Sequence, residues 1–154
     1  MTEFLSFVWL AIFVLCAVYV GQILIFIQGL SRLRRGTNSR LYSVAVVVAA
    51  RNEELHIEKC LRSLLEQDYL SDKYTITVVD DQSTDRTADI VRKLATEHSA
   101  VKLLQLHGHP SGISPIINAI NEAIRSTSSE IILRTDADCV VGPNWISSMV
   151  RHFE

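Results

Sequence analysis

The hydrophobic residues of this chain follow two different patterns. Residues 4–31 contain no charged side chain and are mostly apolar, whereas the remainder alternates short apolar runs with segments in which apolar residues recur every three or four positions. A helix that spans a membrane requires about 20 apolar residues. The first pattern therefore predicts an N-terminal transmembrane anchor over residues 1–31.

The two flanks of this apolar run differ in charge. One acidic residue, Glu3, precedes the run, and four basic residues follow it: Arg32, Arg34, Arg35 and Arg40. Because basic flanks face the cytoplasm, we expect a single-pass membrane protein with its soluble domain on the cytoplasmic side. Residues 32–41 are expected to form a basic juxtamembrane linker near anionic headgroups.

Two alternatives to a membrane anchor fit the apolar run less well. A signal peptide would carry its basic residues before a shorter apolar core, and an uncharged core helix of this length is unusual in a soluble protein.

After residue 41 the pattern predicts strands and helices in alternation. Continuous apolar runs are typical of strands buried on both faces, and they occur at residues 42–50, 74–79, 101–106 and 130–134. Apolar residues at helical spacing predict helices at residues 53–67, 85–97, 115–125 and 143–153. Helical crossovers between such strands predict an α/β fold with a mostly parallel sheet flanked by helices, in one domain over residues 42–154.

Three polar clusters follow strands of this predicted sheet. Ligands of parallel sheets bind beyond the carboxyl ends of the strands, so these clusters are the first candidates for a functional site. They are Arg51–Glu53, Asp80–Asp81 and Asp136–Asp138.

The last cluster has the spacing of a metal site. Two carboxylates that are two residues apart in an extended segment point the same way, and a divalent cation would relieve their repulsion. Carboxylate oxygens suit Mg²⁺ or Mn²⁺, and such a metal could hold a diphosphate. A D-x-D motif also has about even odds of occurring by chance in a chain of this length; the position of Asp136 and Asp138 after a strand favours function.

The other two clusters each allow a structural and a functional interpretation. Asp80 and Asp81 fit a turn with local backbone hydrogen bonds. They also fit a binding site in which a carboxylate accepts a hydrogen bond from a nucleobase N–H or a ribose hydroxyl. Asn52 or Glu53 could cap the following helix, while Arg51 could approach a base or a phosphate.

The amino-acid composition argues against several classes of protein. The 154 residues include 15 Lys and Arg against 17 Asp and Glu, a net charge of −2 that argues against a nucleic-acid partner. A hydrophobic share of 48% excludes a disordered chain. Three cysteines without a regular spacing exclude a disulfide scaffold.

The order of the motifs is more specific than any single motif. A strand ending in AARNEE, a strand ending in VVDDQSTDRT and a strand ending in TDADC follow one another with helices between them. From about Ser43 to Phe153 this order resembles the nucleotide-sugar half of family 2 glycosyltransferases, which have the GT-A fold. The apolar N-terminus is similar to that of membrane-bound members.

The resemblance implies a role for each matching position. The donor would be a nucleotide sugar, UDP-type by this resemblance, bound by Ala49, Arg51, Glu53, Asp80, Asp81 and Asp136. Asp81 would recognise the base while Asp80 supports its loop. Asp136 and Asp138 would bind Mg²⁺ or Mn²⁺ at the diphosphate of the donor. The family transfers the sugar with inversion, in one displacement by an acceptor hydroxyl that a carboxylate base deprotonates.

Two departures from the family pattern bear on this expectation. Pro115 and Ile116 stand where members commonly have Gly and Lys, so a cation near the diphosphate would either be missing or come from Arg134 or Arg125. The sequence also ends shortly after the D-x-D motif, so this chain is expected to be the donor-binding half, with the catalytic base and the acceptor half downstream of Glu154.

Two alternative functions remain open at this point. The chain could be a membrane-anchored binding remnant without activity. It could also be a haloacid-dehalogenase-like phosphatase, in which Asp136 would be the nucleophile, although three predicted strands precede Asp136 and that family's motif usually lies on the first strand.

Overall fold

The computed structural model describes residues 2–32, 36–108 and 112–153. The chain divides into two units, Met1–Arg35 and Gly36–Glu154. Arg34 and Arg35 of the predicted linker lie outside the described residues. Residues 36–41 of that linker belong to the second unit, where the backbone N–H of Asn38 donates to the carbonyl oxygen of Arg151 at 3.2 Å.

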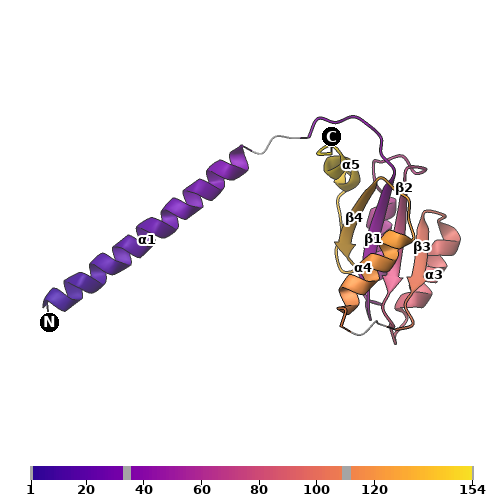
Figure 1. Cartoon of the computed structure of the whole chain (residues 1–154), viewed down its shortest axis with the longest axis horizontal. Coiled ribbons are helices and arrows are strands. Elements are labelled where there is room, and N and C mark those ends of the chain that lie inside the picture. Colours follow the sequence, from indigo (N-terminus) through magenta and orange to yellow (C-terminus); the bar gives the residue numbers. More distant parts are fainter. Residues whose placement is uncertain (1, 33–35, 109–111, 154) are drawn as a thin grey trace. The chain divides into compact units, whose positions relative to one another are not determined.

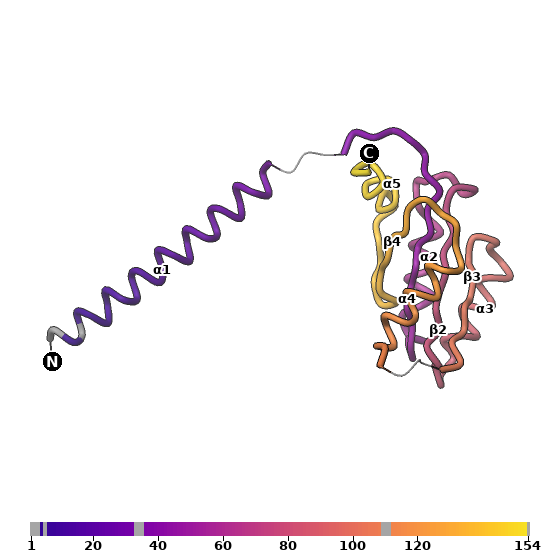
Figure 2. The backbone as a smooth tube through the Cα atoms, in the orientation of Figure 1, coloured from indigo at the N-terminus to yellow at the C-terminus, as the bar shows by residue number. Residues whose placement is uncertain are grey.

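The first unit contains one long helix, α1 (Thr2–Ser31), drawn in indigo to purple in Figures 1 and 2. Large apolar side chains are exposed all around it; Phe13, Leu15 and Phe26, for example, are each more than two-thirds exposed. Its segment Ser6–Ser31 has a mean hydropathy of 2.7 and is long and apolar enough to cross a membrane. A helix that is apolar on every side needs an apolar environment, and the extent of the anchor stays a prediction.

The second unit is built on a parallel sheet of four strands. These are β1 (Val44–Ala50), β2 (Tyr74–Asp80), β3 (Val101–Gln105) and β4 (Ile131–Asp136), in the order β3-β2-β1-β4. The helices that follow the strands are α2 (Ile57–Leu65), α3 (Thr87–Glu97), α4 (Pro115–Arg125) and α5 (Trp145–Val150). The predicted α/β class with a parallel sheet flanked by helices is confirmed.

The main hydrophobic core lies on one face of this sheet. Alternate residues of the central strand β1, including Val46 and Val48, are fully buried there. They pack with apolar residues of three helices, α2, α3 and α5. The apolar positions predicted on these helices form this layer, for example Leu61, Leu94 and Ile146.

The other face of the sheet is covered only in part by the described residues. Helix α4 packs there through Ala119 and Ala123 against Val47 of β1 and Val79 of β2, and it crosses this face in Figure 1. The same face of β4 stays exposed at three alternate positions: Ile132, Arg134 and Asp136. This open side of β4 adjoins the carboxyl edge of the sheet.

Several predicted boundaries differ from the structure by one to four residues, and two of them concern the candidate site. Helix α2 begins at Ile57 instead of Glu53, because the backbone N–H groups of Glu53 and Glu54 are bonded to the side chains of Thr87 and Asp85. The last strand was predicted to end at residue 134 but continues to residue 136, since β4 keeps pairing with β1 to the end.

The D-x-D motif is not extended throughout, as its spacing had suggested. Asp136 is the last residue of β4, but the chain turns at residues 137–138. The backbone N–H of Cys139 closes this turn by donating to the carbonyl oxygen of Asp136 at 3.2 Å. Asp138 is therefore presented by a turn, and its direction depends on tertiary contacts.

Candidate functional site

A cleft of about 520 Å³ lies at the carboxyl edge of the sheet. The strand register aligns Ala50 with Asp80 and Ala49 with Asp136, so the loops that follow three strands meet there. The residues lining the cleft are Ala49, Ala50, Arg51, Glu53, Asp81, Ser114, Pro115, Ile116, Ala119, Asp136, Ala137 and Asp138. The structure thus brings together every predicted site residue except Asp80.

Asp80 lies beneath the cleft instead of in its wall. Its side chain is buried, with 2% of the residue exposed. One carboxylate oxygen accepts from the backbone N–H of Ser83 at 3.3 Å, and the other accepts from the amide of Gln105 at 3.2 Å. These bonds tie the end of β2 to the loop after it and to β3, in keeping with the supporting role expected for Asp80.

Asp81 and Arg51, which both line the cleft, form an ion pair. An Arg51 guanidinium nitrogen, Nη1, lies 3.5 Å from Oδ2 of Asp81. The Asp81 side chain is only 10% exposed, whereas that of Arg51 is 58% exposed. A largely desolvated carboxylate beside an exposed cation can accept a hydrogen bond from a ligand while its charge stays compensated.

The loops after β1 and β2 are joined by hydrogen bonds through Asn52. Its backbone N–H donates to the hydroxyl of Ser83 at 3.0 Å, and its amide oxygen accepts from the backbone N–H of Thr84 at 2.8 Å. Asn52 has a φ of 56° and Gln82 a φ of 57°, a left-handed conformation that asparagine tolerates better than most residues. These contacts hold Arg51 and Asp81 in place from two sides.

A second set of bonds continues this junction into α3. Thr87 is fully buried, and its hydroxyl accepts from the backbone N–H of Glu53 at 2.8 Å while donating to Asp85. Asp85 also accepts from the backbone N–H groups of Thr87 and Glu54. Partial burial raises the pKa of Asp85, but these hydrogen bonds outweigh it and hold the pKa below its ordinary value. Asp85 thus binds the backbone N–H group of Thr87, the first residue of α3.

The D-x-D motif has a basic neighbour and a buried thiol beneath it. Nη2 of Arg134 lies 2.9 Å from Oδ1 of Asp136, and both side chains are largely solvent-exposed. The thiol of Cys60 donates to the carbonyl oxygen of Asp136 at 3.6 Å. Burial raises the pKa of Cys60 to about 12, with a further contribution from the neighbouring Cys139 and Asp138. Cys60 is therefore a packing residue that supports the motif from the core side.

The start of α4 provides an apolar wall. Pro115, Ile116 and Ala119 line the cleft together with the residues of the D-x-D motif. Of the two arginines considered as substitutes for the missing lysine, Arg125 lies at the far end of α4 and pairs with Glu122 at 2.8 Å. Arg134, by contrast, adjoins Asp136.

The charges that line this cleft favour a cation. Four carboxylates face it, from Glu53, Asp81, Asp136 and Asp138, and among the described lining residues Arg51 carries the only positive charge. A diphosphate would be repelled by this surplus of negative charge unless a cation accompanied it. No group of three or more acidic, His or Cys residues that could enclose a metal occurs in the part of the chain described here. Two aspartates suffice for an ion that shares its remaining positions with water and substrate phosphates, as Mg²⁺ does.

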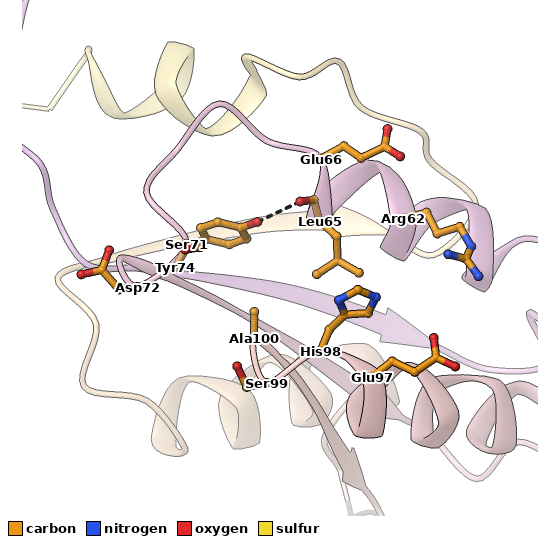
Figure 3. Close-up of a pocket in the computed structure, with 10 residues that line it drawn as sticks. All are labelled: Arg62, Leu65, Glu66, Ser71, Asp72, Tyr74, Glu97, His98, Ser99 and Ala100. Carbon is orange, nitrogen blue, oxygen red and sulfur yellow. Dashed lines mark hydrogen bonds between the residues drawn. The ribbon is translucent and has the colours of Figure 1, made fainter.

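A larger cavity, of about 610 Å³, lies at the opposite edge of the sheet (Figure 3). Tyr74, the first residue of β2, forms part of it and donates its hydroxyl hydrogen to the carbonyl oxygen of Leu65 at 3.3 Å. Its basic residue Arg62 is already paired with Glu58 at 2.6 Å. Since ligands of parallel sheets bind at the carboxyl ends of strands, the smaller cleft is the better candidate despite its size.

Sequence reasoning missed the residues that join the two loops. Asn52 and Thr84 were considered only as helix caps, and Ser83 and Thr87 were given no role of their own. The dense run of hydroxyl and acidic residues at positions 81–87 is the signal that could have indicated them. Their partners lie about 30 residues away in the chain, so only the parallel pairing of β1 with β2 brings the groups together.

Comparisons with known proteins place this chain in one family. The profile of Glycosyl transferase family 2 matches residues 45–154. Beta-monoglucosyldiacylglycerol synthase of Nostoc sp. is 33% identical over 111 residues, which are 72% of this chain and 23% of that protein. The chain thus spans about a quarter of the length of this curated relative.

Two solved structures are similar in both fold and sequence. TarS 1–349 of S. aureus in complex with UDP-GlcNAc has a TM-score of 0.61 at 29% identity, covering 70% of this chain and 30% of that one. The mannosyltransferase PcManGT of Pyrobaculum calidifontis, in complex with GDP-Man and Mn²⁺, has a TM-score of 0.70 at 29% identity, covering 89% of this chain and 41% of that one. The family match extends over most of the second unit, including all of the loops that form the cleft, and the chain belongs to glycosyltransferase family 2.

Proposed function

We propose that this chain binds a nucleotide-sugar donor in the cleft at the carboxyl edge of its sheet, as part of a glycosyltransferase. The observation that carries the proposal is the composition of the cleft, in which Arg51, Asp81 and the D-x-D aspartates converge from three loops. Family membership and the donor complexes of TarS and PcManGT support it.

The base of the donor is recognised by Asp81 in this proposal. A carboxylate accepts hydrogen bonds and donates none, so it suits a base with a ring N–H, such as uracil or guanine. UDP is the expected nucleotide, and GDP is the alternative with the same hydrogen-bonding property. The similar structures contain one of each, UDP-GlcNAc in TarS and GDP-Man in PcManGT.

Asp136 and Asp138 hold a divalent metal, Mg²⁺ or Mn²⁺, at the diphosphate of the donor. Bound there, such a cation would supply Lewis-acid stabilisation of the negative charge on the leaving nucleoside diphosphate. The Mn²⁺ in the PcManGT complex supports this assignment. Arg51 contributes a further positive charge from the loop after β1, and the apolar wall at Pro115 and Ile116 limits access of water from the side of α4.

The reaction is sugar transfer with inversion at the anomeric carbon. An acceptor hydroxyl attacks this carbon in a single displacement, its proton passes to a carboxylate base, and the bond to the diphosphate breaks. The residues assigned here bind and orient the donor, which is a contribution of positioning. We assign no acceptor base among the described residues.

The chain is placed at a membrane by α1, with the glycosyltransferase unit on the cytoplasmic side. The length and hydropathy of Ser6–Ser31 support the first part of this statement. The basic residues that follow the helix in the sequence support the second part.

Nucleotide binding with and without metal tests the proposal. Calorimetric titration of the full chain in detergent with UDP, GDP and ADP, each with Mn²⁺ or with EDTA, should give the tightest binding for UDP or GDP with Mn²⁺. Asp138→Ala should weaken the binding measured with Mn²⁺ by about tenfold or more and change the metal-free binding little. Asp72→Ala, an exposed aspartate at the opposite edge of the sheet, is the matched control.

Two results would contradict parts of this proposal. An equal loss with Mn²⁺ and with EDTA in Asp138→Ala would remove its role as a metal ligand. Absence of binding by every nucleoside diphosphate, with the chain still folded by circular dichroism, would remove the donor-binding function itself.

A further inference from the structure

We infer that Arg134 is the internal counter-ion of Asp136 and that it couples metal binding to diphosphate binding in the cleft. The inference rests on the proposed function, because it concerns the same D-x-D site. Arg134 does not line the cleft, and the sequence suggested it only as a substitute for the lysine that is common in the family. Its effect would be exerted through Asp136, so it is a positioning residue.

The geometry places the guanidinium of Arg134 on an oxygen that a metal would need. Nη2 of Arg134 donates to Oδ1 of Asp136 at 2.9 Å. The two residues are two positions apart in β4, so both side chains lie on the same face of the sheet, next to Val47 and Ala49 of β1 in the register. Helix α4 leaves this side of β4 exposed, and the side chain of Arg134 is 43% exposed. The guanidinium therefore has room to leave Asp136.

A divalent cation and a guanidinium compete for the same carboxylate. A metal on Oδ1 of Asp136 would meet a positive charge at hydrogen-bond distance from that atom, and at this range like charges repel by an amount that changes binding several-fold even in water. Metal binding at Oδ1 without a donor therefore has to displace Arg134 from this oxygen. The displacement leaves one guanidinium without an anion at the edge of the cleft.

A diphosphate offers this guanidinium a new partner. The planar fork of arginine matches phosphate oxygens and binds them in pairs. In this cleft the lysine common in the family is replaced by Ile116, and Arg51 is already close to Asp81. When a donor binds together with the metal, its phosphate oxygens would thus replace Asp136 as the hydrogen-bond partner of Arg134. Metal and diphosphate would then each raise the affinity for the other by the same factor, since coupling between binding sites is reciprocal.

Titration of Mn²⁺ measures this coupling directly. The free Mn²⁺ signal in electron paramagnetic resonance gives the affinity of the full chain in detergent, first with the metal alone and then with saturating UDP or, in parallel, GDP. The variants are Arg134→Gln, which removes the charge, and Arg134→Lys, which keeps it. Arg125→Gln is the matched control, since Arg125 is an exposed arginine paired with Glu122 on α4 and lies away from the cleft.

Arg134→Gln should bind Mn²⁺ alone about three- to tenfold more tightly than the wild type, because no cation has to be displaced. The increase in Mn²⁺ affinity caused by the nucleotide should shrink by about three- to tenfold, since the compensating contact is gone. Arg134→Lys should lie between Arg134→Gln and the wild type in both measurements. Arg125→Gln should match the wild type.

Other outcomes would overturn the inference. If Arg134→Gln and the wild type show the same Mn²⁺ affinity and the same nucleotide effect, Arg134 has no part in the site. The same conclusion follows if Arg125→Gln changes both values as much as Arg134→Gln does, since the effect would then be one of overall charge. If the wild type binds no Mn²⁺, alone or with either nucleotide, the proposed metal site fails and the inference fails with it.

Discussion

The amide oxygen of Asn52 accepts hydrogen bonds from both the backbone N–H and the hydroxyl of Thr84, at 2.8 and 3.3 Å. The two residues are 32 positions apart in the chain and belong to the loops that follow β1 and β2. One side chain therefore ties together the two loops that carry Arg51 and Asp81. Their positions in the cleft are set before any ligand binds, which lowers the entropic cost of binding.

Removal of the Asn52 side chain should weaken nucleotide binding. Asn52→Gly keeps the left-handed backbone without strain, since glycine adopts a positive φ readily. The bonds to Thr84 are lost, so we expect an affinity for UDP or GDP about three- to tenfold weaker and an unfolding free energy lower by about 1 kcal/mol. Calorimetry and urea unfolding measure the two effects. Asn52→Asp keeps an acceptor oxygen and should stay closer to the wild type; unchanged affinity in Asn52→Gly would show that the junction does not position the site.

Asp81 should determine which bases are accepted. Asp81→Asn replaces a pure acceptor by an amide that both donates and accepts. The preference for UDP or GDP over ADP and CDP should therefore fall by about tenfold, while folding is unaffected. Competition of the four nucleotides against a fluorescent nucleotide diphosphate gives the ratios directly. A variant with the wild-type order and spread of affinities would remove Asp81 from base recognition.

Acid should weaken the junction at Asp85. Its pKa in the folded protein is below the ordinary value of 3.8, so ionised Asp85 stabilises the fold. This contribution is fully present above the unfolded-state pKa and is lost as the pH falls through the lower folded-state pKa. The unfolding free energy of the wild type should therefore exceed that of Asp85→Asn by a constant amount above about pH 5, and the difference should shrink on acidification. A difference that does not change down to about pH 2 would contradict this account.

The two cysteines near the D-x-D motif should differ in reactivity. Cys60 is 1% exposed and has a pKa of about 12, whereas Cys139 is exposed. At about pH 8 iodoacetamide should alkylate Cys139 in the folded protein and leave Cys60 unmodified, because the thiolate is the reactive form. Peptide mass spectrometry identifies the modified residues. Cys60 should react once the protein is unfolded in urea, and equal rates in the folded state would mean that the motif is not packed as described.

Much of the fold was readable from the sequence because it depends on local periodicity. The valine-rich run of β1 and the helical spacing of α2 and α4 predicted their elements, and the order of these elements predicted a parallel sheet. The rule that parallel sheets bind ligands at the carboxyl ends of strands then indicated the three loops that line the cleft. The residue types alone indicated which of these loops could hold a metal and which could accept a hydrogen bond from a nucleobase.

The contacts that organise the cleft depended on tertiary structure. Helix α2 starts four residues later than its pattern suggested, since Thr87 and Asp85 take the N–H groups of the residues before it. Asp80 and Asp81 are the same residue type at adjacent positions, so the sequence does not distinguish them. In the structure Asp81 lines the cleft, whereas Asp80 lies beneath it and is bonded to Ser83 and Gln105. Hydrogen bonds between loops depend on which strands are neighbours and in what register, and local sequence does not encode that. The sequence by itself therefore determined the elements, their class and the candidate residues, and only the packed sheet decided which side chains face the cleft and which ones hold it in shape.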